Sequence, residues 1–301
     1  MLSTSRIARC LAGVAGAALA AAALTGAAAP IAAHSATSST AAHHKAAPQY
    51  YVSLGDSLAA GYQPNVGGNT KESYTDQLYA KLKQHDPSLV HVKLGCSGET
   101  TQTMINGGIC SYPGGLSQLA YAEQFLASHR GEVKLVTLDI GANDVDGCLT
   151  AGGLNLTCAE QGVATVGQQL PQITAALHTA GGSTPTYIGM NYYDPFLAAW
   201  LAGPTGQTLA KESVQLSTGF NGAIQAGLAA TGFKLADVSQ TFATDDFTRT
   251  EKVPGIGTLP LNVAHICTWT WECTPYQNIH ANTLGYTVIA SVFERVLEGR
   301  R

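Results

Sequence analysis

Along residues 49–301, hydrophobic positions follow two alternating periods, which predict strands separated by helices. The strand-like runs are short, apolar and bounded by turn residues, and they cover 50–54, 89–94, 133–140, 186–190 and 233–238. The helix-like stretches repeat apolar residues at helical spacing, and they cover 73–84, 116–129, 160–179, 208–230 and 283–297. Strands that alternate with helices of this length pair in parallel through right-handed crossovers. The pattern therefore predicts an α/β fold whose five-stranded parallel sheet has the order 2-1-3-4-5 and helices on both faces.

One long stretch, 239–277, follows neither period. It contains a pair of cysteines, Cys267 and Cys273, and two tryptophans, Trp269 and Trp271. Because an excursion of this length within a compact domain is usually functional or flexible, we expect a loop excursion here.

The N-terminal residues have the pattern of a secretory signal peptide over 1–33. Arg6 and Arg9 precede an apolar stretch of small residues at 11–24, and Ala-rich sequence follows. We expect cleavage between 27 and 36. A retained membrane anchor is the alternative, but an Ala/Gly-rich stretch inserts weakly. Residues 34–48 are small, polar and unpatterned, which predicts a flexible linker to a single domain over 49–301.

Composition and charge exclude several classes of protein. Hydrophobic residues make up 45% of the chain and charged residues 12%, a balance that argues against disorder. The net charge is −4 and no run of Lys or Arg occurs, so we expect no nucleic-acid partner. No internal apolar run approaches the ~20 residues of a membrane span. We expect an extracellular monomer without stable membrane insertion.

Six of the seven cysteines follow the signal peptide, and an even number in an exported chain predicts disulfides. They fall into three local couples, Cys96 with Cys110, Cys148 with Cys158, and Cys267 with Cys273. A zinc site is the alternative, but no C-x2-C spacing occurs and no His stands beside a couple in the zinc-binding pattern. We therefore expect three disulfides and no metal.

Residues suited to acyl transfer follow the predicted strands. The blocks are Gly55-Asp56-Ser57-Leu58 after the first strand, 95–100 after the second, 141–144 after the third, and 278–282 before the last helix. Each block alone is usually turn chemistry. Because the carboxyl ends of parallel strands share one edge, the blocks bring together a hydroxyl, a Gly-flanked turn, an amide and an imidazole. These are the groups that acyl transfer requires as nucleophile, oxyanion donors and general base.

The same blocks resemble the SGNH (GDSL) hydrolase family. The resemblance rests on G-D-S-L at 55–58, G-x-S-G-E-T at 95–100, G-A-N-D at 141–144 and H-A-N-x-x-G-Y at 280–286, which together span most of the domain. The C-S-G-E-T and V-D-G-C segments look most like secreted actinobacterial lipase/esterase members. The resemblance implies a flavodoxin-like three-layer α/β/α sandwich and an enzyme without a cofactor.

Carried over residue by residue, the resemblance implies Ser57 as nucleophile and His280 as general base and acid. The backbone N–H groups of Ser57 and Gly98 and the side-chain amide of Asn143 would form the oxyanion hole. Asp56 and Asp144 are expected to fix their loops through side-chain hydrogen bonds to the backbone. No G-x-S-x-G elbow occurs, which argues against the α/β-hydrolase alternative.

The chain departs from the family pattern at one position. The family has Asp three residues before the base, whereas this chain has Gln277. Since some members use a backbone carbonyl in place of the carboxylate, we expect the Gln277 carbonyl to orient His280. The alternative is a displaced carboxylate, and Glu272 is the nearest candidate.

These observations predict a secreted serine ester hydrolase that acts on a small-molecule or lipid ester. A polysaccharide deacetylase of the same family is one alternative. A non-catalytic binding protein on the same fold is another, and the missing Asp is the only feature that favours it.

Overall fold

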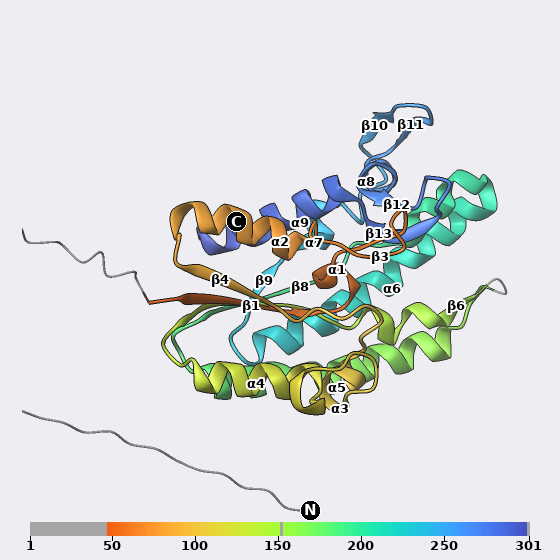
Figure 1. Cartoon of the computed structure of the whole chain (residues 1–301). Coiled ribbons are helices and arrows are strands. Elements are labelled where there is room, and N and C mark those ends of the chain that lie inside the picture. Colours follow the sequence, from red (N-terminus) through yellow and green to blue (C-terminus); the bar gives the residue numbers. More distant parts are fainter. Residues whose placement is uncertain (1–46, 151–152, 300–301) are drawn as a thin grey trace, which may run out of the picture. The chain divides into compact units, whose positions relative to one another are not determined.

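Five parallel strands form the centre of the fold in the computed structural model, which describes residues 47–150 and 153–299 (Figure 1). Across the sheet the order is β4 (Leu89–Lys93), β1 (Gln49–Gly55), β5 (Val133–Asp139), β8 (Thr186–Met190) and β9 (Lys234–Ala236). In chain order this is 2-1-3-4-5, so the predicted topology is confirmed. The expected signal peptide over 1–33, and the linker as far as residue 46, lie outside the described residues.

Helices cover both faces of this sheet, which confirms the three-layer α/β/α sandwich. In Figure 1, α2 (Tyr74–His85) and α9 (Thr283–Leu297) lie together on one face, and α4 (Gln118–Ser128) and α5 (Leu156–Gly181) lie on the other. The helix α6 (Pro204–Ala229) packs against α5. None of the helices in the described part of the chain is both long and apolar enough to span a membrane.

The register of the sheet places the motif blocks at one edge. Strand β1 is fully buried at Tyr51, Val52 and Leu54, because it pairs with β4 on one side and β5 on the other. Its last residue, Gly55, lies opposite Asp139, the last residue of β5. The loops that follow β1, β4 and β5 therefore leave the sheet side by side.

The stretch 239–277 contains regular elements that the sequence did not predict. They are α7 (Val238–Thr241), the hairpin of β10 (Thr250–Val253) with β11 (Gly257–Pro260), the helix α8 (Leu261–Trp269), and β12 (Thr270–Trp271). Most positions of α8 are buried, and no side chain caps its start at Pro260. A short helix that is apolar on most sides shows no helical stripe in the sequence, which explains why periodicity did not reveal it.

Short elements complete the described fold. They are α1 (Ser57–Ala60), β2 (Tyr62–Gln63), β3 (Gly68–Asn69), α3 (Thr101–Asn106), β6 (Leu149–Thr150), β7 (Gly153–Leu154), β13 (Asn278–Ala281), and the 3-10 turns η1 (Pro113–Gly115), η2 (Ala142–Asp144), η3 (Asp146–Cys148) and η4 (Pro195–Ala202). Strand β13 pairs with β12 in a small antiparallel sheet separate from the central one.

The structure pairs the six cysteines of the described chain as their spacing predicts. The disulfides are Cys96–Cys110, Cys148–Cys158 and Cys267–Cys273. Each disulfide closes a short loop, and the paired cysteines are 14, 10 and 6 residues apart in the sequence, in that order. The first joins the loop after β4 to the segment that follows α3, the second joins η3 to α5, and the third joins α8 to the turn before β13. All three therefore brace segments near the same edge of the sheet.

Candidate active site

Ser57 begins the short helix α1 directly after β1, and the two residues before it explain its position. The Asp56 carboxylate caps this helix by accepting the backbone N–H of Leu58 at 2.9 Å. Gly55 has φ +148°, and a Cβ there would come within 2.3 Å of Asp139 Oδ1. Only glycine therefore allows β1 and β5 to approach this closely while the chain turns to present Ser57.

His280 comes from β13 and reaches Ser57 across 223 residues of sequence. Its Nε2 lies 2.7 Å from Ser57 Oγ. The Tyr62 ring packs against the imidazole with 4.5 Å between ring centroids. The Tyr193 hydroxyl donates to the Ile279 carbonyl at 2.7 Å, and this bond holds the strand that carries the base. Two residues that the sequence proposed as a pair are thus within hydrogen-bonding distance.

The other ring nitrogen of His280 contacts Asn278, a residue that the sequence analysis did not select. Asn278 Oδ1 lies 2.7 Å from His280 Nδ1 and also accepts the His280 backbone N–H at 3.2 Å. Because the backbone N–H can only donate, the Asn278 side-chain atom that it contacts is the acceptor oxygen Oδ1. His280 Nδ1 must therefore donate to the same oxygen, so Nδ1 carries the ring proton. Nε2 is then unprotonated where it faces Ser57, which is the tautomer of a general base.

The expected acceptor, the Gln277 carbonyl, is not the partner of Nδ1 in this structure. Gln277 instead has the left-handed φ of +43°, and its N–H donates to the Thr274 carbonyl at 3.0 Å. It turns the chain into β13 and leaves the orienting role to the next residue. Asn side chains readily bond the backbone two residues ahead, so the N-x-H spacing is the sequence feature that identifies Asn278.

No hydrogen bond or ion pair joins Glu272 to His280 among the described residues. Burial raises the pKa of the Glu272 carboxyl to about 7. Burial lowers the pKa of His280 to about 4, with no contribution from a charged neighbour. The imidazole is therefore neutral at neutral pH, and a neutral amide oxygen orients it.

The two other expected oxyanion donors follow β4 and β5. Gly98 has φ +85°, a conformation that suits glycine, and a Cβ there would meet only Ile109 Cδ1 at 4.0 Å. Asn143 lies in η2, and its Nδ2 donates to the Glu99 carbonyl at 2.9 Å. An amide nitrogen carries two hydrogens, so this bond orients Asn143 and leaves a second N–H for a ligand. Ser57 and Asn143 line one pocket with His280, whereas Gly98 is not among its lining residues.

A buried glutamine clamps the loops after β1 and β4 together. Gln118 Oε1 accepts the Gly55 N–H at 2.7 Å, while its Nε2 donates to the Gly55 carbonyl and to Glu99 Oε2, both at 3.0 Å. Asp144 similarly ties the loop after β5 to α3, because its carboxylate accepts the N–H and hydroxyl of Thr101. Nothing in the sequence pattern distinguishes Gln118 from any other polar residue at a helix start.

Two buried carboxyls, Asp56 and Asp139, lie behind the nucleophile. Asp139 accepts from the Tyr74 hydroxyl and the Ala59 N–H, and Asp56 accepts from the Tyr192 hydroxyl at 2.7 Å. Burial is the main cause that raises the pKa of each. Asp56 caps its helix as expected, and neither carboxyl contacts His280.

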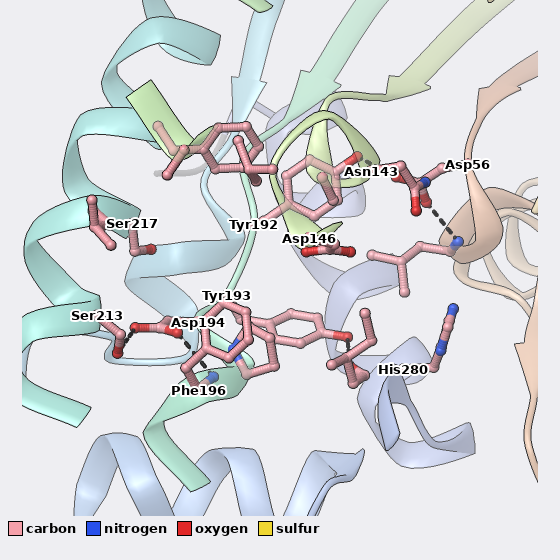
Figure 2. Close-up of a pocket in the computed structure, with 18 of the residues that line it drawn as sticks. Asp56, Asn143, Asp146, Tyr192, Tyr193, Asp194, Phe196, Ser213, Ser217 and His280 are labelled. Carbon is pink, nitrogen blue, oxygen red and sulfur yellow. Dashed lines mark hydrogen bonds between the residues drawn. The ribbon is translucent and has the colours of Figure 1, made fainter. Parts of the chain in front are cut away.

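A pocket opens beside Ser57 and His280, with a volume of about 110 Å³. Figure 2 shows it between the loops at the edge of the sheet and the helix α6. Its walls are mainly apolar and include Val145, Val163, Tyr192, Tyr193, Pro195, Phe196, Leu209, Leu216, Phe220 and Ile279. This lining suits a hydrocarbon portion of a ligand placed next to the hydroxyl and the imidazole.

Comparisons with known proteins bear on the family and the fold of this chain. A family model described as GDSL-like lipase/acylhydrolase matches residues 53–288. An extracellular lipase from Streptomyces rimosus has a similar structure, with a TM-score of 0.53, 19% identity, and coverage of 82% of this chain and 98% of the lipase. A phospholipase A1 from Streptomyces albidoflavus NA297 has a TM-score of 0.50 and 17% identity, with coverage of 85% and 100%. At these identities the structural likeness shows the fold. No curated protein sequence matches the chain.

Proposed function

Because the chain belongs to the GDSL-like lipase/acylhydrolase family, we propose that it is an exported serine ester hydrolase that forms an acyl-enzyme on Ser57. The observation that carries the proposal is the contact of 2.7 Å between Ser57 Oγ and the unprotonated Nε2 of His280, at the mouth of an apolar pocket. A hydroxyl, a neutral imidazole in the right tautomer and a polarised amide are the groups that ester cleavage needs.

In the proposed reaction, His280 Nε2 takes the hydroxyl proton as Ser57 Oγ attacks the ester carbonyl carbon. The carbonyl oxygen becomes negative, and the N–H groups of Ser57, Gly98 and Asn143 stabilise it. Collapse of this intermediate breaks the ester bond, and the leaving alkoxide takes the proton from His280. Water then repeats the sequence on the acyl-enzyme, which releases the acid and restores Ser57.

The apolar walls of the pocket favour acyl esters over acetylated polysaccharides as substrates. Two observations support export. The described cysteines are all disulfide-bonded, which is typical of oxidising compartments. The residues before the domain also have the signal-peptide pattern. A binding protein without chemistry is less well supported, because His280 already has an orienting partner despite Gln277.

The test combines labelling and hydrolysis on the folded protein. A fluorophosphonate should label Ser57, and Ser57→Ala should abolish both labelling and the hydrolysis of p-nitrophenyl esters of increasing chain length. Ser97→Ala removes the other serine hydroxyl of the motif loops and should leave labelling in place. Near-normal turnover in folded Ser57→Ala protein would reject the site. Faster release of acetate from acetylated xylan than of any acyl group from the chromogenic esters would favour the deacetylase.

A further inference from the structure

Three carboxyls line the pocket, and one of them, Asp146, has no partner among the residues that the structure describes. Asp56 accepts the Leu58 N–H and the Tyr192 hydroxyl, and Asp194 accepts the Phe196 N–H at 3.0 Å and the Ser213 hydroxyl at 2.6 Å. The Asp146 carboxyl makes no hydrogen bond or ion pair with any residue in the described part of the chain. In the view of Figure 2 it lies between Tyr192 and Tyr193, on the side of the pocket that holds His280.

The position of Asp146 is built into the fold. It is the first residue of η3, which follows the Asn143 loop, and the disulfide Cys148–Cys158 joins the end of that turn to α5. Val145, its neighbour in sequence, also lines the pocket. The carboxyl is thus held at the wall of the cavity that Ser57 faces.

A carboxyl in this environment is unfavourable unless something pairs with it. Asp146 is of intermediate exposure and its oxygens are not among the fully buried polar atoms, so water can reach the carboxyl through the pocket. A ligand that fills the pocket displaces this water and has to replace its hydrogen bond. Burial, with a smaller contribution from the Asp56 charge, raises the pKa of Asp146 to about 7. Because no residue in the described part of the chain pairs with Asp146, the group that displaces this water must itself bond the carboxyl.

The surroundings favour a hydroxyl over a cation as that partner. Near neutral pH, Asp146 is present in both protonation states, and a hydroxyl can donate to the ionised form or accept from the protonated form. An ammonium group requires the ionised form and would have to lose its water against apolar walls. A hydroxyl on an otherwise apolar chain satisfies both Asp146 and the lining.

We propose that Asp146 is a specificity-determining residue that selects esters carrying a hydroxyl group on the portion that enters the pocket. This inference rests on the proposed function and names the substrate class of the same site: hydroxylated aliphatic esters. The hydroxyl belongs either to the acyl chain or to the alcohol, and the experiment distinguishes the two.

The test compares kcat/KM for matched esters with and without a hydroxyl. The acyl arm uses chromogenic esters of octanoic acid and of hydroxyoctanoic acids with the hydroxyl at successive carbons. The alcohol arm uses acetate esters of octanol and of octanediols. In one arm, kcat/KM for the best hydroxylated ester should exceed that for the matched plain ester about 10- to 100-fold, which corresponds to one hydrogen bond to a charged group.

Asp146→Leu should abolish or reverse this preference, mainly through KM, while Ser57 remains reactive toward a fluorophosphonate. Asp146→Asn should keep part of the preference, because an amide still bonds a hydroxyl. Asp245→Leu, the same substitution at an exposed carboxyl outside the pocket, should leave the preference unchanged.

Equal kcat/KM for plain and hydroxylated esters in both arms would overturn the inference, as would an unchanged preference in Asp146→Leu. Either result leaves the proposed function standing, because plain esters are still hydrolysed and Ser57 is still labelled. Loss of labelling and of all hydrolysis in the unsubstituted protein would reject the proposed function itself.

Discussion

The contact between Asn278 and His280 offers the sharpest test of how this site works. Asn278 Oδ1 lies 2.7 Å from Nδ1, and burial alone lowers the pKa of His280 to about 4. Asn278→Asp would replace a neutral acceptor with a carboxylate at the same place. The carboxylate favours the imidazolium, so the pKa of His280 should rise.

The size of the rise follows from the geometry. Two unit charges about 4 Å apart interact by roughly 4 kcal/mol at an effective dielectric constant of about 20. At 1.36 kcal/mol for each pKa unit, the upper limit is about 3 units. Desolvation of the new carboxylate reduces this gain, so we expect an increase of about 1 to 3 units.

The assay is the pH dependence of kcat/KM on a chromogenic ester. Protonated His280 cannot accept the Ser57 proton, so activity is lost as the pH falls through the pKa of the base. The acidic limb should lie near pH 4 in the unsubstituted protein and move upward in Asn278→Asp. Turnover on the plateau should change by less than about tenfold, because the tautomer is already correct in both proteins.

Removing the acceptor should have the larger effect on rate. In Asn278→Ala, His280 Nδ1 loses its partner and the tautomer is no longer selected, so kcat should fall by about 10- to 1,000-fold. For comparison, the wrong tautomer in a serine protease lowers kcat by about 10⁴. Gln277→Ala is the matched control, and it should keep most activity and the same acidic limb. Near-normal kcat in Asn278→Ala would refute the role of Asn278 and return the Gln277 carbonyl as the candidate acceptor.

Four further predictions concern other parts of the site. Asn143→Ala should lower kcat about 10²- to 10³-fold without changing the circular dichroism spectrum, because one oxyanion donor is lost. Gln118→Leu removes three buried hydrogen bonds and should lower the free energy of unfolding by about 2–4 kcal/mol in urea titrations. Because the pKa of Glu272 is raised, the folded state binds its proton more tightly, and this group makes the protein less stable as the pH rises from about 4.5 to 7. Glu272→Gln should therefore raise the Tm at pH 8 but not at pH 4. A large loss of kcat in this variant would instead make Glu272 a displaced triad acid. Replacing Cys267 and Cys273 by Ala should reduce kcat/KM more than it reduces the far-ultraviolet signal of the sheet, and equal losses of both would contradict a local bracing role.

The sequence predicted most of the sheet and the long helices because their patterns are long and regular. The strand over 186–190 and the helix over 283–297 have the bounds that the pattern predicts. The helix α8 was missed, since it is short, uncapped and buried on most sides. Helix α5 begins before the expected residue 160, at Leu156, where the side chain of Asn155 caps it. Burial on several sides and local capping thus account for these differences.

The sequence predicted the site residues that belong to short motifs, but not those whose role depends on contacts made in the folded chain. Ser57, Asn143 and His280 belong to short motifs, and the order of the strands is enough to expect them at one edge. The roles of Asn278 and Gln118 depend on which atoms meet after folding. The family pattern places the acid three residues before the base, whereas in this chain the contact with the imidazole is made from two residues before it, so the motif does not identify Asn278. Gln118 bonds residues 63 and 19 positions away, and a pattern along one helix does not reveal such pairs.

The nucleophile and the base are held by structures of different strength. Ser57 follows a strand that is paired on both sides, and Gln118 and Asp139 fix the backbone around it. His280 instead lies on β13, a short strand outside the central sheet. Among the described residues, β13 pairs only with the two residues of β12. Single hydrogen bonds from Tyr193 to Ile279 and from Gln63 to Ala281 supplement that pairing, and the disulfide Cys267–Cys273 braces the turn before it. Elements with few backbone pairings open at lower free energy than central strands. The position of the base is therefore the more easily perturbed half of the site, and substitutions around β12 and β13 should affect proton transfer before they affect the central sheet.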